Sequence, residues 1–167
     1  MLVTGPSDAS FIFGPSVDGD LVPDSPYKLL QEGKFARIPF ISGNNKDEGT
    51  IFTPTSIPDN PSLAAVGFST LQPGGLSQNI LQEVFGSVYP NIPSQGSPFG
   101  TGNETFGLSP VFKQAAAIIG DAAFQAPRRW FLRQANAQNF DEKWSYHFEA
   151  TLASQPGYRG CKSTVTM

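Results

Sequence analysis

The sequence predicts an α/β fold, on three observations. An apolar, β-branched stretch at 36–43 does not alternate with polar residues, a long periodic stretch at 109–127 is typical of a helix, and residues 143–151 alternate as a strand does. The 17 Gly and 15 Pro among 167 residues indicate many turns and long loops rather than a helical bundle. Strands separated by helical segments are typical of the α/β class.

The first expected helix covers 26–33. Ser25 is placed to cap it, Pro26 suits its first position, and Gly33 suits its end. The apolar stretch ARIPFISG at 36–43 then predicts a strand buried on both faces, as in a parallel sheet.

A helical insert is expected between the two strands. Loops at 53–77 and 91–107 flank a helix at 77–90, whose apolar stripe consists of Ile80, Leu81, Val84 and Phe85. The next helix, 109–127, has Ser109 as its cap and Pro110 at its first position, and its apolar face consists of Phe112, Ala115, Ala116, Ile119 and Ala123. We expect Pro127 to break this helix and a second helical piece to follow at 128–139.

The last expected strand is 143–151. Its aromatic residues Trp144, Tyr146 and Phe148 alternate with Ser145, His147 and Glu149.

Composition excludes several classes of protein. The net charge is −3 and no basic stripe occurs, so nucleic acid is not an expected partner. No apolar run approaches the roughly 20 residues that span a bilayer. The segment MLVTGPSDAS has neither the basic nor the apolar region of a signal peptide, and Cys161 is the single cysteine.

The segment GNNKDEGT at 43–50 admits two interpretations. Amides, charges and glycine after an apolar stretch are typical of a turn, in which Glu48 is a solvated carboxylate. Alternatively, Glu48 is held at the carboxyl end of a strand for chemistry.

Longer motifs favour the second interpretation. VDGDLVPDSPYKLLQEGKFARIPFISGNNKDEGTIF at 17–52 resembles the type-B carboxylesterase, lipase and cholinesterase family. GSPFGTG at 96–102 and LSPVFKQAAAIIGDAAFQAPRR at 108–129 are most similar to its fungal extracellular lipases. The resemblance covers about 11–158, between an irregular start at 1–10 and a divergent tail at 159–167.

The resemblance implies the C-terminal part of an α/β-hydrolase fold, with an incomplete sheet and a helical insert. It implies ester or lipid substrates, no cofactor and no metal, and an extracellular family. Glu48 matches the family's triad acid, which orients the histidine and stabilises imidazolium. We expect Lys46 and Asp47 to be solvated neighbours and Gly49 to allow a sharp turn.

The other parts of the family's machinery are not found in these 167 residues. No G-x-S-x-G elbow occurs, and the serine of GSPFG at 96–100 is in the wrong place. Gly74-Gly75 follows the acid, whereas the family's oxyanion glycines precede it. The family's histidine is expected near Ser163, where no histidine stands.

His147 is the single histidine, and it lies inside the expected strand rather than in the loop beyond it. We therefore expect it to be packed or exposed without a catalytic role. Asp121 matches an acidic position that pairs with a later arginine in the cholinesterase branch; here either Arg128 or Arg129 pairs with it, or it is exposed. Where that branch has a cysteine, this chain has Ala126.

The resulting hypothesis is a fragment of a carboxylic ester hydrolase that carries the triad acid and is inactive alone. The alternative is a non-catalytic binding or adhesion module similar to the cholinesterases. A third interpretation is an incomplete gene model, in which case neighbouring genomic DNA should encode the elbow serine and the histidine. Asn103, in Asn103-Glu104-Thr105, is a possible N-glycosylation acceptor.

Overall fold

The computed structural model describes residues 17–57, 59, 78–151 and 155–161. The expected irregular start at 1–10, the Gly74-Gly75 pair, the position of Ser163 and most of the 53–77 loop lie outside the described residues. The chain divides into two compact units, Met1–Pro39 with Phe131–Glu142, and Phe40–Trp130 with Lys143–Met167. Each unit is described by itself.

The first unit contains the short helix α1, Pro26–Gln31. Ser25 occupies its N-cap position, and Gly33, with a φ of 71°, follows its end as expected. The side-chain amide of Gln138 donates to the Gln31 carbonyl over 3.1 Å. These contacts attach α1 to the segment that follows α5 (Ala126–Ala137), whose last residues belong to this unit.

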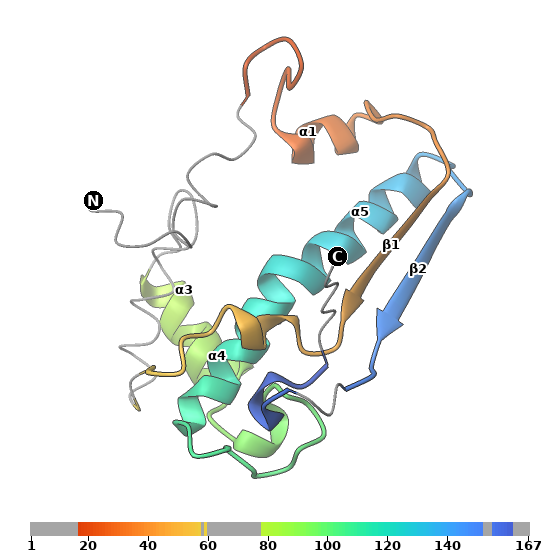
Figure 1. The fold of residues 1–167 in the computed structure, drawn as a ribbon. Helices are drawn as coiled ribbons and strands as arrows, with labels where there is room; N and C mark the ends of the chain where they lie inside the picture. Colours follow the sequence, from red (N-terminus) through yellow and green to blue (C-terminus); the bar gives the residue numbers. More distant parts are fainter. Residues whose placement is uncertain (1–16, 58, 60–77, 152–154, 162–167) are drawn as a thin grey trace. The chain divides into compact units, whose positions relative to one another are not determined.

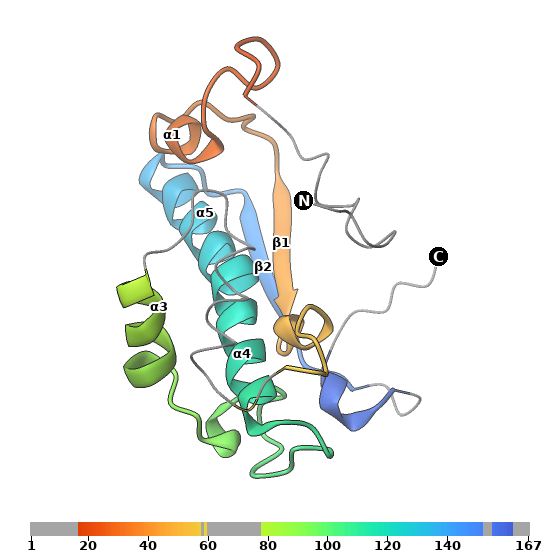
Figure 2. The same cartoon turned by 90° about the vertical axis from the view of Figure 1, so that its left-hand side faces the viewer.

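The second unit contains a parallel pair of strands, β1 (Phe40–Asn45) and β2 (Lys143–Phe148). Ile41 lies opposite Trp144 and Asn45 opposite Phe148, and the two strands run side by side in both views (Figures 1 and 2). The expected parallel arrangement is therefore found. The strand begins after Pro39, which has no N–H for the ladder, and it continues through Gly43-Asn44-Asn45 instead of turning there.

The expected burial of the first strand on both faces is wrong for the described residues. The Ile41 side chain is 69% exposed, and the aromatic residues on the same face of β2 are also exposed: Trp144 56%, Tyr146 55% and Phe148 40%. The opposite face is covered over β1, where Asn44 is buried and Arg128 reaches it from the helical run. On β2 the same face stays open, because Ser145, which Arg128 also bonds, and His147 are exposed.

The second unit contains most of a long helical run. Within it lie α4 (Pro110–Gly120), a π-helical turn at Asp121–Gln125, and α5 as far as Trp130. The Ser109 hydroxyl caps α4 by accepting from the Val111 N–H over 3.2 Å, as expected. Pro127 does not break the helix: a π-helical turn lies just before it, and α5 continues past it to Ala137.

The core of this unit lies between α4 and the preceding helix. That helix is shorter than expected: α3 spans Gln78–Glu83 and continues as a π turn, Val84–Val88. Phe85 packs in a buried cluster with Val111, Ala115, Ile118 and Ile119. The expected stripe is only partly buried, since Ile80 is 47% exposed, and the Leu81 side chain lies outside the described residues.

Candidate active site at the end of β1

Glu48 lies three residues beyond Asn45, the carboxyl end of β1, and is the first residue of a short 3-10 helix, Glu48–Ile51. One carboxylate oxygen, Oε1, accepts from the backbone N–H of Asn45 over 2.8 Å and from its side-chain amide over 3.0 Å. The side chain is half-buried. A carboxylate with two amide donors on one oxygen has a fixed direction, as an orienting acid requires.

The strand end that holds Glu48 is itself fixed by side chains from the helical run. Gln125 donates from its side-chain amide to the Asn45 carbonyl over 3.1 Å. The Arg128 guanidinium bonds both Asn44 and Ser145, so it joins the two strands, and Gln125 accepts from the same guanidinium over 3.1 Å. Gln125 and Arg128, from the FQAPRR end of the 108–129 stretch, therefore position the strand end that precedes Glu48.

Gly49 allows a close approach rather than the sharp turn that we expected. Its φ does not lie in the left-handed region, but a Cβ there would lie 1.9 Å from the Ala116 carbonyl oxygen and 2.6 Å from the Gly120 nitrogen. The backbone after Glu48 therefore packs directly on α4. Thr50 is 2% exposed, and its hydroxyl lies 2.8 Å from the Asp47 carbonyl and 2.7 Å from the Arg159 carbonyl.

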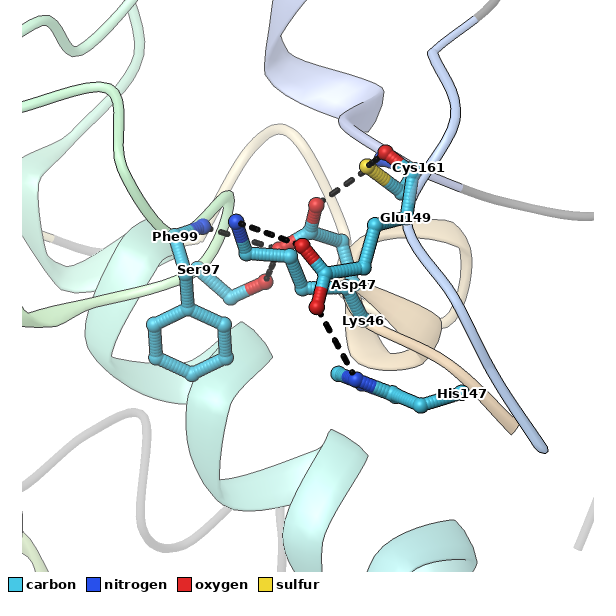
Figure 3. A network of polar contacts seen from close by, with 7 residues as sticks. All are labelled: Lys46, Asp47, Ser97, Phe99, His147, Glu149 and Cys161. Carbon is cyan, nitrogen blue, oxygen red and sulfur yellow. Dashed lines mark hydrogen bonds and ion pairs between the residues drawn. The ribbon is translucent and has the colours of Figure 1, made fainter. Parts of the chain in front are cut away.

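The expectation that Asp47 is solvated is wrong. Its side chain is 2% exposed, and its two oxygens accept three hydrogen bonds (Figure 3). The Ser97 hydroxyl (2.9 Å) and the Phe99 N–H (2.8 Å) bond Oδ1, while the Cys161 N–H bonds Oδ2 over 2.8 Å. Burial is tolerated because the carboxylate has donors on both oxygens.

Lys46 and His147 lie on the rim of this network. The Lys46 ammonium is 4.0 Å from the Glu149 carboxylate, and the Nδ1 of His147 is 3.3 Å from it (Figure 3). The Lys46 side chain is 29% exposed and that of His147 45%. His147 therefore contacts Glu149, whereas the Glu48 carboxylate is bonded by Asn45.

Cys161 closes the network from the other side. It is 4% exposed, its thiol donates to the Glu149 carbonyl over 2.7 Å, and its carbonyl accepts from the Asp47 N–H over 3.3 Å. Burial raises the pKa of the Cys161 thiol, and the nearby negative charge of Asp47 adds to the shift. Such a thiol is a structural group rather than a nucleophile.

Asp121 has a partner that sequence reasoning did not weigh. The Tyr89 hydroxyl donates to its carboxylate over 2.6 Å, in place of Arg128 or Arg129. Burial raises the pKa of Tyr89 far above its ordinary value, and the bond to the charged carboxylate raises it further. Asp121 therefore anchors the end of the Val84–Val88 turn to the helical run.

Three other kinds of site concern glycosylation, metal binding and a small cavity. Asn103 lies on an exposed turn, and its glycosylation stays a prediction. Within the described ranges, no group of three or more His, Cys, Asp or Glu residues is placed to hold a metal ion, and no helix is both long and apolar enough to cross a bilayer. A cavity of about 190 Å³ is lined by Tyr89, Gln114 and their neighbours, and Glu48 is not among its lining residues.

Comparisons with known proteins bear on this arrangement. The model of the carboxylesterase family matches residues 2–164. The chain belongs to the carboxylesterase family. This family member is 38% identical to Lipase 2 of Geotrichum candidum over 134 residues, which is 80% of this chain and 23% of the lipase. It is also 38% identical to a secreted triacylglycerol lipase of Gibberella zeae, over 79% of this chain and 22% of the lipase.

A more distant relative and a solved structure agree with this assignment. The chain is 37% identical to mouse cholinesterase over 54% of its length and 14% of the cholinesterase. The crystal structure of EstA from Aspergillus niger matches 92% of this chain and 27% of EstA, with a TM-score of 0.74 and 26% identity. This carboxylesterase-family chain has a partial α/β-hydrolase fold. It spans about a quarter of the length of the curated relatives that it matches.

Proposed function

We propose that this chain supplies the acid of a Ser-His-Glu carboxylic ester hydrolase, with Glu48 in that role. The observation that carries the proposal is the fixed carboxylate at the end of β1, oriented by two amide donors from Asn45. A triad acid must be held rigidly and stay ionised, so that it fixes the histidine tautomer and stabilises imidazolium. Family membership and the lipase names of the relatives support ester or lipid substrates.

We further propose that the 167 residues do not hydrolyse esters by themselves. They contain no G-x-S-x-G elbow, and their one histidine, His147, lies within β2 next to Glu149. Without nucleophile and base, little acceleration remains. The purified chain should not turn over p-nitrophenyl butyrate above a buffer blank. Turnover that disappears in His147→Ala would contradict this and would give the histidine a role.

The acid role itself is tested in a completed enzyme, made by replacing the matching segment of a full-length relative with this chain. Glu48→Gln keeps the size but removes the charge, and it should lower turnover by about 10⁴-fold, as the loss of a triad acid's charge does elsewhere. That is roughly 5 kcal/mol of transition-state stabilisation.

Glu83→Gln is the matched control, because Glu83 is an exposed glutamate on α3. It should leave turnover within about twofold, as surface changes usually do. Equal retention of activity in both variants, with unchanged thermal melts, would remove Glu48 from the catalytic machinery.

A further inference from the structure

We propose that Asp47 is a positioning residue that holds the Glu48 turn in place by joining it to two distant segments of the chain. This inference rests on the proposed function of Glu48. Asp47 directly precedes Glu48. It occupies the N-cap position of the 3-10 helix whose first residue is Glu48. Any displacement of Asp47 therefore moves the backbone that carries the acid.

The two oxygens of Asp47 serve different segments. Oδ1 accepts from the Ser97 hydroxyl and the Phe99 N–H, whereas Oδ2 accepts from the Cys161 N–H. The backbone N–H of Asp47 also donates to the Cys161 carbonyl over 3.3 Å, so the two residues bond in both directions. The turn is thereby fastened to 97–99 on one side and to 160–161 on the other.

Gly160 packs closely against the Asp47 carboxylate. A Cβ on Gly160 would lie 2.3 Å from Oδ2 and 2.8 Å from the Pro98 side chain, and Gly160 itself has a φ of 57°. Thr50 adds a further link, since its hydroxyl lies within bonding distance of the Arg159 carbonyl. Asp47, Gly49 and Thr50 are buried, whereas the side chain of Glu48 between them is half-buried.

The chemistry of the site requires a carboxylate rather than an amide. All three side-chain partners are donors, and an asparagine offers one acceptor oxygen and one donor nitrogen. In Asp47→Asn the oxygen should face the two donors of the 97–99 segment, so that the NH₂ group opposes the Cys161 N–H. The substitution should therefore release the 160–161 segment while the other side stays bonded.

Amide hydrogen exchange in the full 167-residue chain tests this, measured by mass spectrometry with peptide fragmentation at low protein concentration. Asp47→Asn should speed exchange of the Cys161 amide by roughly tenfold to hundredfold, as loss of a hydrogen bond to a charged group would. The Phe99 amide should change by less than about threefold, since its acceptor remains. The Asn45 amide, which bonds Glu48, should also exchange faster because the acid's turn is loosened.

Ser97→Ala is the matched control, because it removes one donor from Oδ1 and leaves the Cys161 bond intact. It should leave exchange at Cys161 unchanged. Gly160→Ala is the second variant: it keeps the Asp47 charge but displaces Oδ2, and it should reproduce the faster exchange at Cys161 and Asn45. Unchanged exchange at these amides in Asp47→Asn, or a uniform rise over the whole chain in both variants, overturns the proposal.

Kinetics in the completed enzyme separate positioning from simple stabilisation. Asp47→Asn should lower kcat by up to about 10²-fold with little change in KM, because a displaced acid affects the chemical step and not substrate binding. An unchanged kcat overturns the positioning role. If Glu48→Gln also keeps its turnover, the acid assignment has failed, whereas the exchange data still decide whether Asp47 fastens the two segments.

Discussion

The phenol of Tyr89 shows how one half-buried residue makes stability depend on pH. Its pKa is raised, first by burial and then by its bond to Asp121. Above the ordinary pKa of 10.0, the unfolded chain releases this proton while the folded chain keeps it. The stabilisation that Tyr89 contributes to the folded state is therefore fully present below that pH and is lost as the pH rises. Tyr89→Phe should cost about 1 kcal/mol at neutral pH and should flatten the loss of stability above about pH 10.

Urea unfolding from about pH 8 to about pH 11 measures this, with Tyr146→Phe on β2 as the matched removal of a phenol. Lys113 acts in the opposite direction. Because burial lowers its pKa, its contribution to the free energy of unfolding rises with pH up to its ordinary pKa of 10.5. Lys113 is present in every variant, so it does not affect the comparison. A Tyr89→Phe curve as steep as that of the unchanged chain would contradict the assignment.

Single residues also show what the sequence could and could not predict. Glu48 could be singled out because its motif is local, and the structure places it three residues beyond the end of β1, while its catalytic role stays a proposal. Asp47 was misjudged because its partners lie 50, 52 and 114 residues away along the chain. No local pattern carries that information, and a charged residue in a turn is exposed far more often than buried.

At the scale of elements, the decisive contact is the one between the Glu48–Ile51 turn and α4. Gly49→Ala should destabilise the chain by about 1–3 kcal/mol or more, because the new methyl group would overlap backbone atoms that cannot move aside. Gly120→Ala is the matched control: its Cβ would be 3.3 Å from the Gly49 nitrogen, and the helix gains about 1 kcal/mol from alanine. Thermal or urea unfolding measures both, and equal effects would show that the approach at Gly49 is not tight.

The elements themselves were largely predictable, and their boundaries were not. Pro26, Ser109 and the alternation of 143–151 located α1, α4 and β2 because these signals act locally. Pro127 misled, since the helix passes it after a π turn whose last residue, Gln125, bonds the strand end 80 residues earlier in the chain. Gln125 and Arg128 bond Asn45 and Asn44, which belong to β1 although local propensity assigned them to a turn.

At the scale of the whole molecule, the described sheet has one open apolar face. Ile41, Trp144, Tyr146 and Phe148 share that face and are each 40% exposed or more. The apolar composition of 36–43 predicted burial on both faces. Composition indicates which environment suits a strand, but it does not show which elements cover the strand in a given chain. A contiguous face of this kind favours association with other apolar surfaces.

The purified chain should therefore self-associate and bind a hydrophobic dye such as anilinonaphthalene sulfonate. Trp144→Lys should reduce both light scattering after size exclusion and dye fluorescence, because it replaces an exposed aromatic side chain of this face with a charge. Val88→Lys is the matched control, since Val88 is 61% exposed but lies on the π turn after α3, away from the strands. A monodisperse monomer with a sharp cooperative melt and no dye binding would show that this face is covered in solution. Equal improvement by both variants would show instead that general apolar exposure, and not the sheet, drives the association.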